Sequence, residues 1–214
     1  MLFMETRTNI LLRAGLTMNE FNEKNYIIVR GFLDAEAVQT VSRYMEYSLK
    51  SDGFKKGESS ENPNHEVSTY YRYADPLTET ILYNSLEEIE QVVGKKLFPT
   101  YSYSRVYVKG DELKAHTDRE SCEFSVSVNV ATKGEHWPLY MQSAGKPPTS
   151  FILEPGDAVI YKGCEVLHWR EKAINTEVNV QFMLHYVDQS GSYSEYKFDG
   201  RESLGSKFKQ VRST

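Results

Sequence analysis

The second half of the chain alternates two kinds of residue with a period of two, and this pattern limits the folds that it can adopt. Ser125, Ser127 and Asn129 alternate with valines, and 101–108 has the same period. Successive side chains of a strand point to opposite faces, so the alternation is typical of strands in a sheet. With Gly- and Pro-containing turns between them, strands are expected at 101–108, 124–130, 139–142, 150–153, 158–161 and 178–187. Short strands in such a series predict a β-sandwich or barrel.

The first half of the chain has the spacing of helices. Apolar side chains recur every three or four residues after Asp34, an expected N-cap, and predict a helix over 34–50. A second helix is expected over 75–94, with Pro76 in its first turn. A short strand is expected at Tyr26–Val29. The predicted fold class is α+β, in which N-terminal helices flank a jelly-roll core at about 98–188.

Three segments lie outside these elements. Residues 1–24 are expected to be an irregular or weakly helical lead, and 189–214 a polar tail that follows the main domain at 25–188. The stretch 51–68 is rich in Gly, Ser, Asn and Lys and predicts a long surface loop. Long loops in compact domains are often functional, so we interpret 51–68 as a candidate lid or substrate-contact segment.

Composition narrows the class of function. The 214 residues include 25 basic and 30 acidic ones, and the net charge of −5 argues against a general nucleic-acid-binding protein. No apolar run approaches the roughly 18 residues that a membrane span requires. The two cysteines, Cys122 and Cys164, are too few for a disulfide framework. No targeting signal is apparent, so a cytoplasmic location is the default expectation.

His116 and Asp118 are the first candidates for a functional site. Residues at i and i+2 of an extended chain point to the same face, so this imidazole and this carboxylate can bind one metal ion. His168 follows 50 residues after Asp118, beyond a Gly-containing turn and a strand. Two His side chains and one carboxylate, with open coordination positions, form the facial triad of non-haem iron(II) oxygenases. We therefore predict a metal site made of these three residues.

The sequence around these residues resembles the 2-oxoglutarate- and Fe(II)-dependent oxygenases, specifically their prolyl 4-hydroxylase-like branch. The similarity covers about 26–188. The matching pieces are Tyr107-x2-Gly110-x5-His116-x-Asp118, the turn Pro155-Gly156-Asp157-Ala158, His168, the closing strand 179–186 and the first segment, 26–34. The resemblance implies a double-stranded β-helix that holds Fe(II) through His116, Asp118 and His168. It also implies that dioxygen and the co-substrate 2-oxoglutarate are consumed, that succinate is formed, and that a C–H bond, with a prolyl residue as the leading suggestion, is hydroxylated.

The sequence departs from this family at the residue that binds the distal carboxylate of 2-oxoglutarate. The family has Arg or Lys on the closing strand, where the nearest match here is Gln181. A neutral amide binds a carboxylate more weakly than a cation does. One alternative is that another cation replaces the missing one, and the candidates are Arg170, two residues after His168, and Arg105. The other alternative is that the co-substrate binds differently. Tyr107 matches a family position in contact with the co-substrate and completes the expected co-substrate site.

Two other interpretations stay open. A cupin-like metal protein shares the β-helix, but its first motif usually has His-x-His followed by Glu, where this chain has His116-x-Asp118. A non-enzymatic jelly-roll binding module would use its histidines for structure alone. For an oxygenase, the expected partner is a peptide or small-molecule substrate. The substrate itself and the oligomeric state cannot be read from the sequence.

Overall fold

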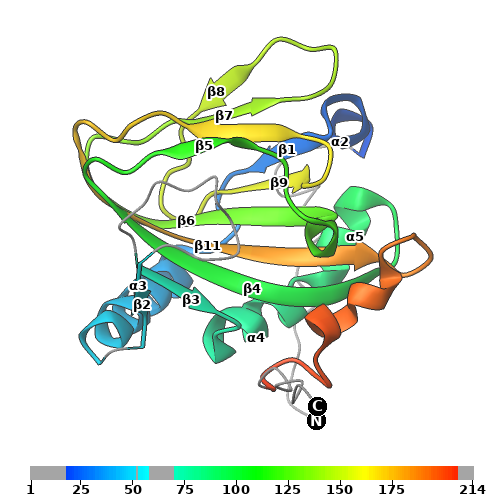
Figure 1. The fold of residues 1–214 in the computed structure, drawn as a ribbon, viewed down its shortest axis with the longest axis horizontal. Coiled ribbons are helices and arrows are strands. Elements are labelled where there is room, and N and C mark those ends of the chain that lie inside the picture. The colour runs from blue at the N-terminus through cyan, green and yellow to red at the C-terminus, as the bar shows by residue number, and fades with distance from the viewer. Residues whose placement is uncertain (1–17, 52, 58–69, 207–214) are drawn as a thin grey trace, which may run out of the picture.

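Two antiparallel β-sheets face each other in the computed structural model, which describes residues 18–51, 53–57 and 70–206 (Figure 1). The strands are β1 (Tyr26–Val29), β2 (Lys55–Lys56), β3 (Tyr70–Tyr73), β4 (Leu97–Val108), β5 (Leu113–His116), β6 (Phe124–Gly134), β7 (Leu139–Gln142), β8 (Thr149–Phe151), β9 (Ala158–Lys162), β10 (Leu167–Arg170) and β11 (Thr176–Asp188). The larger sheet has the order β1-β9-β6-β11-β4-β3-β2, and the smaller sheet has the order β5-β10-β7-β8. This architecture is consistent with the predicted jelly-roll core.

Helices cover the side of the larger sheet that faces away from the smaller sheet (Figure 1). They are α3 (Ala35–Lys50), α4 (Pro76–Asn84) and α5 (Leu86–Val93), while a further helix, α2 (Met18–Lys24), packs against β1 and α5. Asp34 caps α3 as predicted, because its side chain accepts a hydrogen bond from the Ala37 N–H. None of the described helices is both long enough and apolar enough to cross a membrane.

The helix that was predicted over 75–94 is in fact two helices. Ser85 separates them with φ −90° and ψ −4°, and its N–H bonds to the Ile81 carbonyl to end α4. Leu82 of α4 and Ile89 of α5 are both fully buried in the core under the larger sheet.

The two faces of the larger sheet have different chemistry. On β11, Phe182 and Leu184 are fully buried in the apolar core that the sheet shares with the helices. Gln181 and His185 alternate with them and therefore point to the opposite face, between the two sheets. They are also buried. The larger apolar core thus lies outside the space between the two sheets, which we call the barrel interior. The barrel interior holds a smaller apolar cluster on β7 and β9 together with the polar side chains of β11, where a site can form.

The described parts of the predicted loop and of the predicted N-terminal lead contain regular secondary structure. Within the predicted loop 51–68, Lys55–Lys56 form β2, which pairs with β3. A two-residue strand carries no periodicity, so the sequence could not indicate it. Residues 58–68, on which the lid hypothesis mainly rests, and 1–17 of the predicted lead lie outside the described residues.

The C-terminal segment packs against the domain through buried charges. Arg201 is buried, and its Nη2 donates to the carboxylate of Glu79 on α4 and to the Thr100 carbonyl of β4. Asp199 lies in the 3-10 segment Ser194–Gly200 and accepts hydrogen bonds from the Tyr73 hydroxyl and from Arg119. The first part of the predicted polar tail is therefore anchored to α4, β3 and β4.

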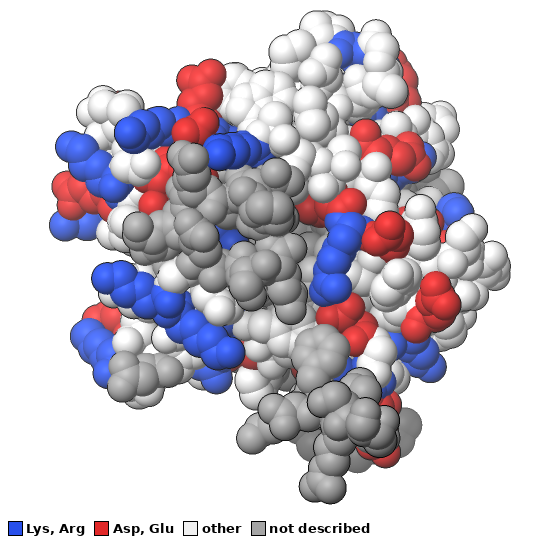
Figure 2. All heavy atoms as spheres, in the orientation of Figure 1, with Lys and Arg blue, Asp and Glu red and all other residues white. Residues whose placement is uncertain are grey.

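Charges at the surface are of mixed sign. Figure 2 shows acidic and basic side chains interspersed over one face, with Lys and Arg most numerous on its left side. Surface pairs such as Lys133 with Glu177 are more than half exposed, and ion pairs of this kind contribute little to stability. The charged groups that demand a structural explanation are therefore the buried ones, among them Arg105 and Arg170.

Candidate metal centre

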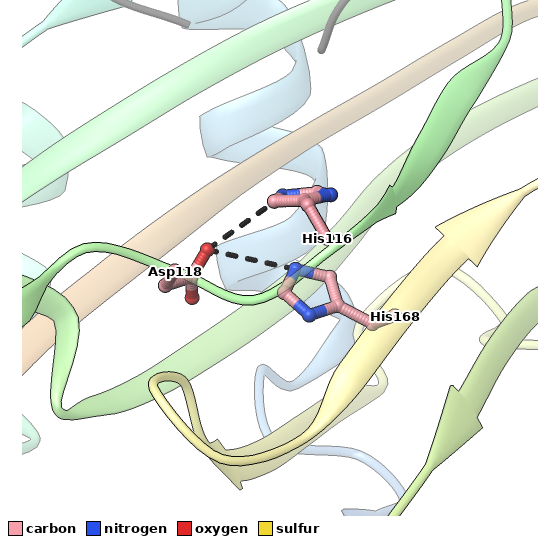
Figure 3. Close-up of side chains that lie close together, drawn as sticks. All are labelled: His116, Asp118 and His168. Carbon is pink, nitrogen blue, oxygen red and sulfur yellow. Dashed lines mark ion pairs between the residues drawn. The ribbon is translucent and has the colours of Figure 1, made fainter.

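The three residues that the sequence predicts as metal ligands lie together between the sheets. Figure 3 shows the Asp118 carboxylate turned toward both imidazole rings. Its Oδ1 is 3.8 Å from Nε2 of His116 and 3.6 Å from Nε2 of His168. One ligand atom from each residue lies within 4.8 Å of the other two. The three donor atoms therefore converge on one point.

Two short strands of the smaller sheet position the histidines. His116 ends β5, His168 lies on β10, and their Cα atoms are direct cross-strand partners. The centroids of their rings are 4.3 Å apart. Asp118 follows β5, and its backbone N–H bonds to the Gly163 carbonyl at 2.9 Å. Strand pairing thus brings together histidines that are 52 positions apart in the sequence.

Local hydrogen bonds orient both rings before any metal is bound. Nδ1 of His116 is 2.8 Å from the Lys114 carbonyl, and Nδ1 of His168 is 3.0 Å from the Val166 carbonyl. A carbonyl can only accept, so each Nδ1 carries the proton and each Nε2 keeps a lone pair. Burial, with a contribution from the neighbouring His168, lowers the pKa of His116. Both features favour the neutral imidazole that a metal ion requires.

The second carboxylate oxygen of Asp118 is held by a polar chain that sequence analysis did not find. The Ser125 hydroxyl donates to Oδ2 of Asp118 at 2.9 Å and accepts from Nδ1 of His185 at 2.9 Å. His185 is 5% exposed, and burial lowers its pKa to about 4, so it stays neutral. The alternation of Ser125 with valines indicated that it lies on the polar face of its strand, but it carried no signal for the pairing with His185.

A glycine makes room for the same carboxylate. A Cβ atom at Gly163 would lie 2.7 Å from Oδ2 of Asp118 and would overlap the Cys122 carbonyl oxygen. The first contact would displace the carboxylate, and the second could be relieved only by movement of the backbone. Gly163 therefore permits the position of Asp118, and only the folded structure reveals this role.

The four predicted co-substrate residues also lie side by side. Arg105 on β4 is the cross-strand partner of Gln181 on β11, and its guanidinium lies 5.7 Å from the centroid of the Tyr107 ring. Arg170 on β10 reaches across to Gln181, with its Nη2 3.1 Å from Oε1. All four side chains are buried. Trp137, which sequence analysis did not select, completes this group because its carbonyl accepts from Arg170.

Comparison with known proteins finds similarity in structure alone. No family model matches the chain, and no curated protein matches its sequence. A prolyl hydroxylase from Trichoplax adhaerens, solved with a peptide fragment of the hypoxia-inducible factor oxygen degradation domain, superposes with a TM-score of 0.67 at 12% identity, over 86% of this chain and 95% of that one. A prolyl-4-hydroxylase from Pseudomonas putida gives 0.62 at 13% identity, over 78% and 96%. The non-haem α-ketoglutarate-dependent carbocyclase SnoK of nogalamycin biosynthesis gives 0.66 at 13% identity, over 80% and 82%. The chain therefore has the fold of 2-oxoglutarate- and Fe(II)-dependent oxygenases.

Proposed function

We propose that this protein is a 2-oxoglutarate- and Fe(II)-dependent dioxygenase that hydroxylates a C–H bond. A fold by itself hosts many functions, so the proposal rests on the site. The observation that carries it is the convergence of two imidazole nitrogens and one carboxylate oxygen within 4.8 Å, inside the barrel. This donor set fits Fe(II), because two neutral histidines and one carboxylate form the facial triad and leave positions open for other ligands.

The side chains around the triad have distinct tasks in this proposal. His116 and His168 present Nε2, while Ser125 occupies Oδ2 of Asp118 and leaves Oδ1 to bind the metal. The buried Tyr161 ring packs edge-on against His168 at 4.9 Å and keeps water from that side of the site. These contacts hold the ligands in place before the reaction, which is the main contribution of a protein to cofactor chemistry.

Fe(II) held by His116, Asp118 and His168 would supply the activation of dioxygen that couples decarboxylation of 2-oxoglutarate to succinate with hydroxylation of the substrate. The co-substrate is proposed to lie against Tyr107, Arg105, Arg170 and Gln181, next to the triad. These residues offer two cations and an amide in a buried space, the chemistry that a dicarboxylate needs.

A peptide or a small molecule is the proposed substrate class, with a prolyl residue as the finer proposal. Among the matching structures are the hydroxylase with its bound peptide and HygX with bound hygromycin B. In this chain, Tyr71 stacks on Tyr103 and Tyr73 stacks on Tyr101, along β3 and β4. Flat aromatic surfaces of this kind suit the packing of an apolar ring. A panel of prolyl peptides and small molecules, screened by mass spectrometry for the gain of one oxygen atom, tests this assignment.

An anaerobic titration tests the proposed function itself. Iron(II) and then 2-oxoglutarate are added to the metal-free protein, and the visible charge-transfer band of the chelated keto acid is recorded. The band should form in the wild type and in His136→Ala, which alters an exposed histidine that pairs with Glu154. It should be absent in His116→Ala. Iron binding without the band would favour the cupin-like alternative, and no iron binding would favour a binding module.

A further inference from the structure

Arg170 is a buried cation whose neighbours, among the residues that the structure describes, do not balance its charge. It is 2% exposed. Its Nη1 donates to the Trp137 carbonyl and its Nη2 to Gln181, while its Nε has no hydrogen-bond partner among the described residues. Both acceptors are neutral. Arg201 provides the contrast within the same chain, because it is equally buried but pairs with the carboxylate of Glu79. A buried charge without a counter-ion is costly, so an anion that binds beside Arg170 would relieve this cost.

Arg105, the other buried cation of this group, has different neighbours. Its guanidinium lies 5.7 Å from the centroid of the Tyr107 ring and 5.4 Å from the centroid of the Tyr103 ring. Arg105 is thus embedded among tyrosines, whereas Arg170 still has a donor to offer.

The position of Arg170 suits a ligand that also reaches the metal centre. His168 and Arg170 are two residues apart on β10, so their side chains share a face at a spacing of about 6.6 Å along the strand. A five-carbon dicarboxylate can span such a distance. Gln181 uses Oε1 to accept from Arg170, so it fixes the guanidinium rather than providing the charge. A basic residue at position 181 would instead place a second cation against Arg170.

We propose that Arg170 on β10 binds the distal carboxylate of the 2-oxoglutarate co-substrate, oriented by Gln181 on the facing strand. The inference rests on the proposed function. It places on β10 the cation that the 2-oxoglutarate- and Fe(II)-dependent oxygenases have on the closing strand. Arg170 is thereby the residue that selects a dicarboxylate over a monocarboxylic keto acid.

Anaerobic calorimetry of the iron-loaded protein tests the selection. The wild type should bind 2-oxoglutarate far more tightly than 2-oxobutyrate, which lacks the distal carboxylate. Arg170→Met should weaken 2-oxoglutarate binding by about 100-fold, the equivalent of one charge-assisted hydrogen-bonded contact, and leave 2-oxobutyrate unchanged. Arg105→Met should change the preference by only a few-fold. The proposal would be overturned if Arg170→Met kept the wild-type preference for 2-oxoglutarate over 2-oxobutyrate. It would also be overturned if only Arg105→Met lost that preference.

Two further measurements protect this test against a folding defect. Arg170→Met should keep its affinity for Fe(II) and should lower the melting temperature less than Arg201→Met does, because no buried carboxylate loses its partner. The double variant Arg170→Met/Gln181→Arg returns a cation to the pocket from the facing strand and should restore the preference for 2-oxoglutarate. A melting temperature as low as that of Arg201→Met would identify Arg170 as a structural residue instead.

The anion site can also be tested without metal. The Arg170 guanidinium lies 5.0 Å from the centroid of the Trp137 ring, so a carboxylate bound there should alter the fluorescence of that tryptophan. In a Trp169→Phe background, which leaves Trp137 as the remaining tryptophan, glutarate should give a saturable change that Arg170→Met abolishes. If glutarate binds but 2-oxoglutarate forms no complex with the iron, the proposed function fails and the anion site stands. If glutarate does not bind, the anion site is refuted.

Discussion

Protonation of His185 should make the protein lose stability between pH 6.5 and about pH 4. The imidazole is buried, hydrogen-bonded to Ser125 at 2.9 Å, and burial lowers its pKa from 6.5 to about 4. In the unfolded chain its pKa is close to the ordinary 6.5. As the pH falls below 6.5, the unfolded state therefore binds a proton that the folded state does not accept. The stability contributed by the neutral ring is fully present above pH 6.5 and is lost toward pH 4.

The size of the effect follows from the two pKa values. A difference of one unit in pKa corresponds to about 1.4 kcal/mol, so His185 alone accounts for a loss of about 3 kcal/mol in the free energy of unfolding. That is a large fraction of the 5–15 kcal/mol typical of a folded domain. The pKa of His116 is also lowered, so its titration acts in the same direction. A variant is therefore needed to isolate the contribution of His185.

Urea unfolding of the metal-free protein at a series of pH values measures this contribution. His185→Asn retains a side-chain amide near Ser125 but does not titrate, so its free energy of unfolding should fall by about 3 kcal/mol less than that of the wild type over the window. His136→Asn, at an exposed position, should behave as the wild type. Equal slopes for His185→Asn and the wild type would refute the reasoning, as would a folded-state pKa near 6.5 in an NMR titration.

Three further outcomes are expected. Ser125→Ala removes the hydrogen bond to Oδ2 of Asp118 and should weaken Fe(II) binding by about 10- to 100-fold in an anaerobic titration; unchanged affinity would exclude the positioning role. Gly163→Ala puts a Cβ 2.7 Å from the same oxygen, so calorimetry should show a lower melting temperature and weaker metal binding together, and wild-type values for both would contradict the steric argument. Arg201→Met leaves the buried Glu79 without its counter-ion and should cost about 3–5 kcal/mol in the free energy of unfolding; a cost below 1 kcal/mol would mean that the carboxylate is not buried in solution.

Sequence patterns predicted the long strands and some of the short ones. The predicted strands 124–130 and 178–187 correspond to β6 and β11, whose side chains alternate between the apolar core and the barrel interior. The four-residue strands β1 and β7 were also predicted, whereas β5 and β10, of the same length, were not. Four residues give little periodicity, and β5 and β10 were missed although they carry both histidines of the candidate metal centre. Their pairing depends on contacts between residues far apart in sequence.

The candidate site was predictable to the extent that it depends on spacing. His116 and Asp118 share a face because of their i, i+2 separation, which is a local property of the chain. The roles of Ser125 and Gly163 could not be predicted, because each depends on where Asp118 lies in three dimensions. The sequence also left Arg105 and Arg170 equivalent. Their neighbours in the folded structure distinguish them, since Arg105 lies against tyrosine rings, whereas Arg170 donates to neutral carbonyl groups and its Nε has no partner among the described residues.

The direct pairing of His116 with His168 has a consequence for the stability of the protein against unfolding and proteolysis. A metal ion bound to both would act as a cross-link between β5 and β10 and close a long segment of chain into a loop. Metal binding and folding would then be thermodynamically linked, and free Fe(II) at 100 times its Kd would add about 2.7 kcal/mol to the free energy of unfolding. Scarcity of iron would expose more unfolded chain to proteases, so the abundance of the protein would follow the supply of its own cofactor.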